Sequence, residues 1–217
     1  MSCAGHLPSV DLSRVTATSI LSAEHQVILQ VLDVLGKLAS KAAADGEIPA
    51  AHARQALDVL RRFADECHHG KEEHVLFPRL ESIAPGFGPT QVMRAEHVEG
   101  RALIAGMGRA LEAGDAATFA AAARGYSNLL RAHIMKEDDI LFRLAGQMLT
   151  PAQDAELVEA YRRIEHDEIG EGTHERMLGL ADALALTYGV RRASDDPRVS
   201  ALLTAVCGCR ADVRQAS

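Results

Sequence analysis

The chain has 217 residues, enough for one large domain or two small ones. Hydrophobic residues make up 47% of it and charged residues 24%, which is the composition of a globular protein. Its net charge is −7, and the basic residues are spread out among acids, which argues against a surface for nucleic acid. No apolar run approaches the roughly 18 residues that span a bilayer, and the N-terminus lacks the regions of a signal peptide. We therefore expect a soluble, cytoplasmic protein without a nucleic-acid or membrane partner.

An all-α fold is expected, because aromatic residues make up only 4% of the chain, Trp is absent, and Ala and Leu recur throughout. Periodicity of about 3.6 residues and its interruptions mark the helices. The predicted helices cover 16–44, 50–83, 90–113, 115–148 and 151–188.

The connections between these helices are short. The segment 85–89 (Pro-Gly-Phe-Gly-Pro) separates the second helix from the third, and Asp115 is placed to cap the fourth. Thr150 and Gln153 form a capping-box pattern around Pro151 at the start of the fifth helix.

Short connections make neighbouring helices antiparallel, so we expect an up-down-up-down four-helix bundle over 16–148. A segment 1–15 precedes it. A fifth helix, over 150–190, is expected to pack on the bundle, and 191–217 is expected to form a tail, because it turns polar and breaks at a proline.

The four cysteines are sparse for a chain that can fold without disulfides, so free thiols are expected. Cys207 and Cys209 could chelate a metal or oxidise, but two thiols supply only half of a tetrahedral site. Free cysteines in the tail are the preferred interpretation.

The first four predicted helices contain two copies of one helix pair. Residues 23–25 (Ala-Glu-His) reappear as 95–97, and residues 68–77 match 133–142 with identities at His, Lys, Glu, Leu and Phe. This repeat fixes how the two halves of the chain are compared.

The repeat aligns His68 with His133 and Glu72 with Glu137, so each half contains one His-x-x-x-Glu. Residues four apart share a face of a helix, with Cβ atoms about 5–6 Å apart, so an imidazole and a carboxylate can bind one ion. A metal site is therefore predicted.

A competing pair of candidate ligands is His69 and Glu73, which are also four residues apart. Helical periodicity distinguishes the two pairs, because the residues that share a helix face with His68 are apolar and those that share a face with His69 are charged. The first face carries Leu57, Leu60, Ala64 and Val75, and the second carries Asp58, Arg62 and Asp65. We prefer His68 with Glu72, and expect His69 and His74 to lie on the surface or to support the ligands.

His25, His97 and His133 also share faces with apolar residues, so four imidazoles and two carboxylates face one core. A single inward histidine can be a hydrogen-bonded core residue. Two buried carboxylates, however, cost several kcal/mol per charge unless something positive compensates them. A metal pair does so, and the predicted ligands are His25, His68, Glu72, His97, His133 and Glu137.

Imidazole together with carboxylate suits iron, manganese or zinc. Six ligands exceed the needs of one tetrahedral zinc ion. Two irons that are bridged by Glu72 and Glu137, each also held by two imidazoles, would keep open positions for an exogenous molecule. We therefore expect two iron ions.

The sequence over 20–145 resembles the hemerythrin-like HHE cation-binding proteins, whose H…HxxxE…H…HxxxE pattern is matched by the six predicted ligands. The resemblance implies a pair of Fe²⁺/Fe³⁺ ions, oxo- or hydroxo-bridged, that binds a small diatomic or peroxide ligand. Hemerythrins proper have a fifth histidine and an Asp where this chain has only His133 and Glu137, which argues against simple reversible O₂ carriage. The related iron–sulfur-cluster repair proteins carry an N-terminal cysteine-containing domain, which Cys3 alone does not replace.

The fifth helix offers a replacement for the missing ligand, since residues 165–175 concentrate His and Glu around two glycines that permit a bend. His174 is the first choice and Glu168 another, against the alternative of an exposed polar face. Tyr126, seven residues before His133, either donates a hydrogen bond to a bound oxygen species or is a plain core tyrosine.

Three functions compete. The preferred one is a di-iron protein that binds O₂, peroxide or nitric oxide in redox, oxidative-stress or nitrosative-stress chemistry, as an oxidoreductase with an unknown electron donor. The alternative is an iron- or oxygen-sensing module without turnover, because metal-binding free energy is also folding free energy. A structural bundle with fortuitous histidines is disfavoured by the cost of burying its carboxylates.

Overall fold

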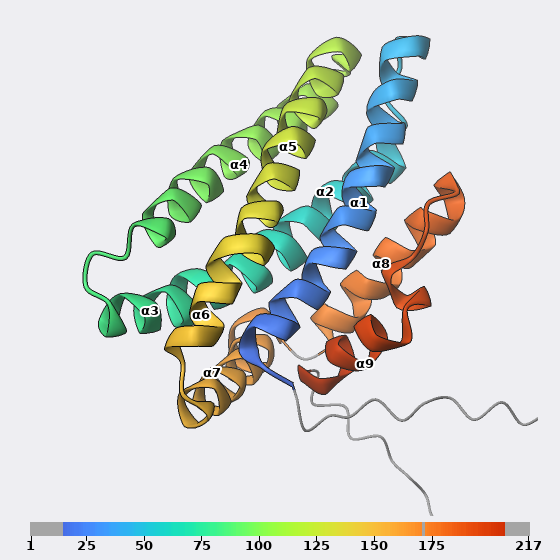
Figure 1. Cartoon of the computed structure of the whole chain (residues 1–217). Helices are drawn as coiled ribbons and strands as arrows, with labels where there is room; N and C mark the ends of the chain where they lie inside the picture. Colours follow the sequence, from blue (N-terminus) through green and yellow to red (C-terminus); the bar gives the residue numbers. More distant parts are fainter. Residues whose placement is uncertain (1–14, 171, 207–217) are drawn as a thin grey trace, which may run out of the picture.

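A computed structural model describes residues 15–170 and 172–206. Within these ranges every regular element is a helix, which confirms the all-α prediction (Figure 1). None of the helices in the described ranges is both long and apolar enough to cross a membrane.

The first four helical segments follow the predicted order and form a helical bundle. The first is α1 (Ala17–Asp45), and the third is α4 (Gly88–Ala113). The second runs through α2 (Ala50–Val59), the π-helices η2 (Leu60–His69) and η3 (Glu72–Leu76), and α3 (Phe77–Ile83). The fourth consists of α5 (Ala116–Lys136), the π-helix η4 (Glu137–Leu141) and α6 (Phe142–Met148).

The C-terminal part is more broken than predicted. It consists of α7 (Pro151–Arg163), the π-helix η5 (Ile164–Gly170), α8 (Thr173–Tyr188), a short 3₁₀ turn η6 (Ala193–Asp195) and α9 (Pro197–Val206). Gly170 and Gly172 have φ angles of +90° and +76°, a conformation that favours glycine, so the expected fifth helix is interrupted there. In the segment expected to be a tail, α9 packs on α1 and buries Leu202 and Leu203. Cys3, Cys207 and Cys209 lie outside the described residues.

The predicted helix starts have the expected caps. The Asp115 side chain accepts a hydrogen bond of 3.0 Å from the Thr118 amide, and Thr150 with Gln153 forms the capping box. One boundary differs, because α4 begins at Gly88 and takes Pro89 into its first turn. Proline is tolerated there, since the first amides of a helix have no partner within it.

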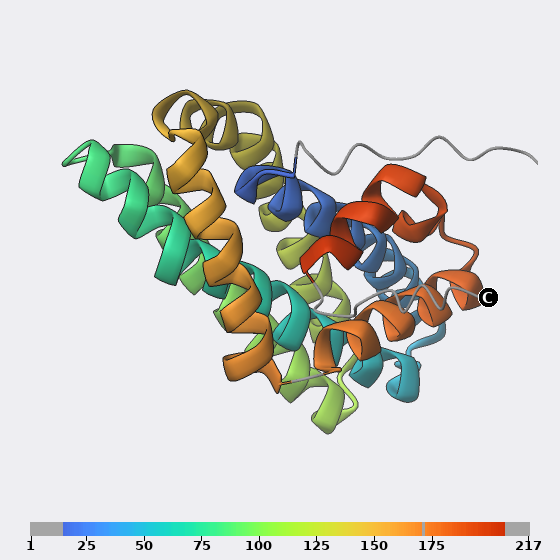
Figure 2. The same cartoon turned by 90° about the horizontal axis from the view of Figure 1, so that it is seen from below.

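The helices pack side by side, with α5 between α1 and α4 (Figure 1). The second segment contacts both α1 and α4, while α8 and α9 lie against α1. Seen from below, α7 runs across the end of the bundle, where it contacts α1 and η3 (Figure 2).

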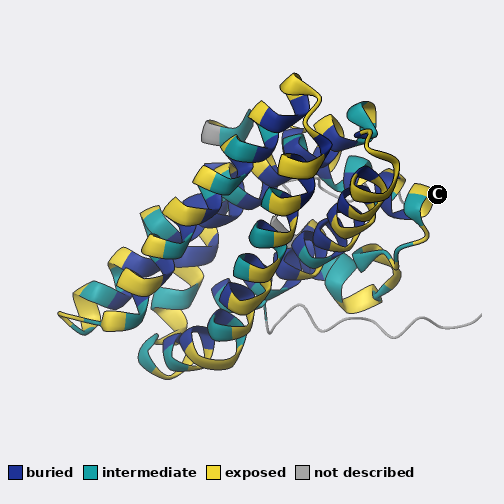
Figure 3. Ribbon diagram, turned by 90° about the horizontal axis from the view of Figure 1, so that it is seen from above, coloured by how far each residue is buried: buried dark blue, intermediate teal, exposed yellow. Residues whose placement is uncertain are grey.

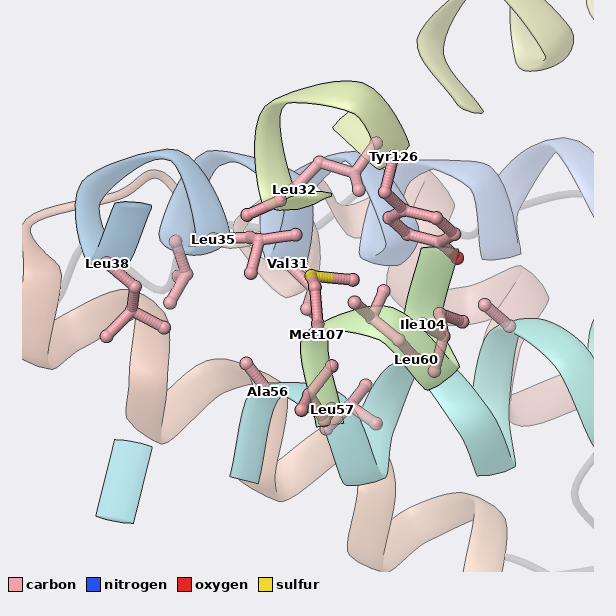
Figure 4. Packing of buried hydrophobic residues seen from close by; sticks show 14 of the residues in the cluster. Val31, Leu32, Leu35, Leu38, Ala56, Leu57, Leu60, Ile104, Met107 and Tyr126 are labelled. Carbon is pink, nitrogen blue, oxygen red and sulfur yellow. The ribbon is translucent and has the colours of Figure 1, made fainter. Parts of the chain in front are cut away.

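Buried residues follow the inner faces of the helices, and exposed residues follow the outer faces (Figure 3). The larger apolar cluster fills one half of the bundle, where Leu35 of α1, Leu57 of α2 and Met107 of α4 pack together (Figure 4). A smaller cluster, which includes Leu21, Phe77 and other residues of α1, α3 and α7, fills the opposite half.

A polar layer lies between these two clusters. Along α1, Leu21 belongs to the smaller cluster and Val27 to the larger one, and His25 lies between them. The other three segments show the same order of apolar, polar and apolar positions. The fold thus brings the polar face of each segment to one depth inside the bundle.

Candidate metal centre

Seven buried side chains meet in the polar layer, none of them more than 4% exposed. They form two groups, and in each group the donor atoms lie within 4.8 Å of one another. One group is His25, His68, Glu72 and Glu137, and the other is His69, Glu72, His97 and His133. Because Glu72 belongs to both groups, the two sets of donors share a carboxylate.

Each carboxylate lies between one imidazole from each half of the chain. The Glu72 oxygens are 3.8 Å from Nε2 of His68 and 3.4 Å from Nε2 of His97. Oε2 of Glu137 lies 3.2 Å from Nε2 of both His25 and His133. The structure therefore brings all six sequence-predicted side chains together, in an arrangement suited to two bridging carboxylates.

In each of the four repeat-related histidines, Nδ1 lies within hydrogen-bond distance of a further carboxylate. Nδ1 of His25 is 3.0 Å from Asp138, and Nδ1 of His97 is 2.7 Å from Glu73. The same contact, at 2.9 Å, joins His68 to Glu24 and His133 to Glu96. Such contacts fix the ring so that Nε2 faces an ion. Sequence reasoning missed these carboxylates, although the repeat contains them at matching positions.

His69 does not lie on the surface, which was one of the two places expected for it, since it is only 4% exposed and belongs to one donor group with Glu72. The other expectation, that it supports the ligands, stays a prediction. The cause of its burial is the π-helix η2, whose wider turn brings His68 and His69 to the same layer. Asp65, which the sequence placed on a solvated face, is the side chain that holds Nδ1 of His69, at 3.3 Å. His69 thus brings a fifth imidazole to the layer.

Burial and neighbouring carboxylates have opposite effects on the pKa values of His25 and His97. Burial alone lowers the pKa of His25, but nearby carboxylates, that of Asp138 foremost, outweigh it and raise this pKa to about 10. Burial is likewise outweighed at His97, where Glu72 and a second carboxylate raise the pKa to about 9. Burial and neighbouring imidazoles lower the pKa of His69 well below its usual value. The layer thus holds protons where a metal would bind.

The residues fit a pair of metal ions. Six donor atoms that face the layer are buried and have no hydrogen-bond partner: Nε2 of His25, Nε2 of His69, and both carboxylate oxygens of Glu72 and Glu137. Buried polar atoms without partners are rare and costly in folded proteins. Cations between the carboxylates would satisfy all six atoms at once.

The comparisons with known proteins agree with this geometry. A family model described as the hemerythrin HHE cation binding domain matches residues 16–145. The chain belongs to the hemerythrin HHE family. It is also 25% identical over 185 residues to uncharacterized proteins of Mycobacterium tuberculosis and Mycobacterium bovis, a match that covers 81% of this chain and 71% of each relative. No solved structure matches the chain.

Two of the three additional candidates, His174 and Tyr126, lie outside the two donor groups of this hemerythrin-like layer. His174 is buried against the ring of Phe63, and its Nε2 lies 3.9 Å from Glu24 and not among the seven donors. Tyr126 is buried in the larger apolar cluster (Figure 4), and its hydroxyl has no hydrogen-bond partner among the described residues. The Glu168 side chain lies outside the described residues. Their predicted roles stay predictions.

Metal binding is expected to tighten as the pH rises from about 6 to about 8. In this range the raised pKa values keep His25 and His97 protonated, so an ion must displace both protons. Each displaced proton contributes about a tenfold gain in apparent affinity per pH unit, so two protons give about 100-fold per pH unit. Competition of the metal-free protein with a chromophoric Zn²⁺ chelator at several pH values measures this slope, and a slope near zero would contradict the assignment.

Proposed function

We propose that this protein is a hemerythrin-like non-haem di-iron protein that binds O₂, peroxide or nitric oxide at its iron pair. The observation that carries the proposal is the set of six buried, unpartnered donor atoms, arranged in two groups that share Glu72. Mixed imidazole and carboxylate donors suit iron. Iron bound there would supply an open coordination position and electrons for a small molecule.

Each donor group would hold one ion. The first ion would be bound by His25 and His68, and the second by His69, His97 and His133. Glu72 and Glu137 would bridge them, since each carboxylate faces imidazoles of both halves. The first ion has one imidazole fewer, so we place the open position on its side.

Apolar rings limit what can reach this position. The ring of Phe142 stacks on His25 with centroids 5.4 Å apart, and Phe77 stacks on His97 at 6.0 Å. These rings cover imidazoles of both halves in a buried layer, which favours a diatomic or peroxide ligand over a larger substrate.

We also infer that the four long segments run up, down, up and down, as in hemerythrin-like bundles. The short connections, including that between α4 and α5 at Gly114, support antiparallel neighbours. The helices from α7 onward would then be an addition that covers one side.

Consumption of hydrogen peroxide or nitric oxide by the iron-loaded protein tests the function. Zinc-loaded protein is the matched control, because zinc takes the same ligand types and has no redox chemistry. We expect sustained consumption by the iron form alone. Equal rates for both forms would contradict an iron reaction, and a single stoichiometric binding event without turnover would favour a sensing module.

A further inference from the structure

A third group of metal-binding side chains lies beside the polar layer, and a lysine already occupies it. Donor atoms of Glu24, Cys67 and Glu165 lie within 4.8 Å of one another, and all three residues are buried. The ammonium of Lys71, which has no solvent exposure, contacts the carboxylates of Glu24 and Glu165, the latter at 2.5 Å.

These carboxylates need a positive charge, because Glu24 is 1% exposed and Glu165 is 7% exposed. Lys71 supplies it, and Nε2 of His174 lies 3.9 Å from one carboxylate and 3.8 Å from the other. Oε2 of Glu165 has no hydrogen-bond partner. The group is therefore a cation site that retains an unused donor.

The internal repeat supplies a comparison within the same molecule. In the second half, Lys136 contacts Glu96, which holds Nδ1 of His133, just as Lys71 contacts Glu24, which holds Nδ1 of His68. The Lys136 side chain is 33% exposed, and no second acid contacts it among the described residues. The C-terminal elements η5 and α8, which bring Glu165 and His174, pack on η2 of the first copy.

We propose that Lys71 is a resident cation, which occupies a third metal site and thereby keeps Glu24 as the acceptor for Nδ1 of His68. With Lys71 in place, one oxygen of Glu24 binds the ammonium and the other faces His68 at 2.9 Å, so neither is free to coordinate an ion. Lys71 is thus a positioning residue that limits the number of metal ions. The part of the proposal that concerns His68 rests on the proposed iron pair, whereas the third site does not.

Without the ammonium, the same side chains form a binding site for a divalent ion. Two carboxylates, the Cys67 sulfur and the nearby imidazole of His174 are ligand types that Zn²⁺ and Co²⁺ accept. Coordination of an ion by the Cys67 sulfur would displace the thiol proton.

The test replaces Lys71 by methionine, whose unbranched side chain is slightly shorter and carries no charge. We expect Lys71→Met to bind one more Zn²⁺ per chain than the native protein, and with Co²⁺ to show thiolate-to-cobalt absorption in the near ultraviolet. The band should vanish in Lys71→Met with Cys67→Ser. Lys136→Met, at the repeat-related position, should give neither the additional ion nor the band.

Loss of Lys71 leaves two buried carboxylates uncompensated, so the metal-free variant is expected to melt about 10 °C below the native protein. Co²⁺ should restore the melting temperature or, if the variant does not fold without metal, the fold itself. A folded variant without the additional ion, or a variant that Co²⁺ fails to rescue, overturns the proposal. A native protein that binds no metal would refute the iron pair, yet the one-ion difference would still be measurable.

Discussion

Replacing Glu72 by alanine is expected to abolish binding of both ions. Glu72 is fully buried, belongs to both donor groups, and faces imidazoles from both halves of the chain. Bound metal stabilises the folded state by mass action, by roughly 4 kcal/mol when its concentration is about a thousand times the Kd. The variant should therefore contain almost no iron and should melt about 10 °C below the iron-loaded native protein.

Iron analysis and thermal unfolding, with and without added Fe²⁺, measure this effect. Glu66→Ala is the matched control, because Glu66 lies on η2 of the same segment but is exposed. It should leave both the iron content and the melting temperature unchanged. A Glu72→Ala protein that keeps two irons would show that the shared carboxylate is not a ligand.

Replacing His69 by alanine is expected to remove one ion and spare the other. His69 belongs to only one donor group, whereas the second group keeps all four of its side chains. The loss should lower the iron content by about one ion per chain and eliminate the spectrum of the coupled pair. Iron analysis together with Mössbauer spectroscopy follows both changes.

His74→Ala is the control for His69, because His74 is exposed in the same helical segment. It should behave as the native protein does. If His69→Ala also kept two irons and an unchanged spectrum, the preference of the sequence for His68 as the sole ligand of that segment would stand, and the burial of His69 would have a purely structural cause.

The helical segments and the meeting of six side chains could be predicted from the sequence, because both depend on local patterns. Apolar residues recur with helical spacing around His25, His97 and His133, and the repeat aligns the two His-x-x-x-Glu segments without knowledge of the fold. The two apolar clusters on either side of the layer confirm the inward direction of these side chains.

His69 could not be placed correctly from helical periodicity, because periodicity assumes an α-helix with a constant turn. The π-helices η2 and η3 change the direction of the side chains in the segment that contains the ligands, and the sequence contains no clear sign of a π-helix. The charge of Asp65 also favoured the wrong prediction, because it made the helix face of His69 appear solvated. In the structure Asp65 contacts the buried His69.

The environment of His174 was beyond sequence reasoning for a different reason. Its neighbours Glu24 and Glu165 come from distant parts of the chain, and their meeting depends on how η5 and α8 dock on the bundle. No pattern of neighbouring residues in the sequence predicts a contact between such distant segments. For the same reason, the burial of Lys71 could not be expected from a lysine in a charged stretch.

The iron content and the optical spectrum of protein purified aerobically from iron-replete cells test the central claim most directly. We expect about two irons per chain and the absorption of an oxo- or hydroxo-bridged ferric pair, because two donor groups share the carboxylate of Glu72 in one buried layer. Fully folded protein that contains no metal, or a single ion with no sign of a coupled pair, would contradict the account.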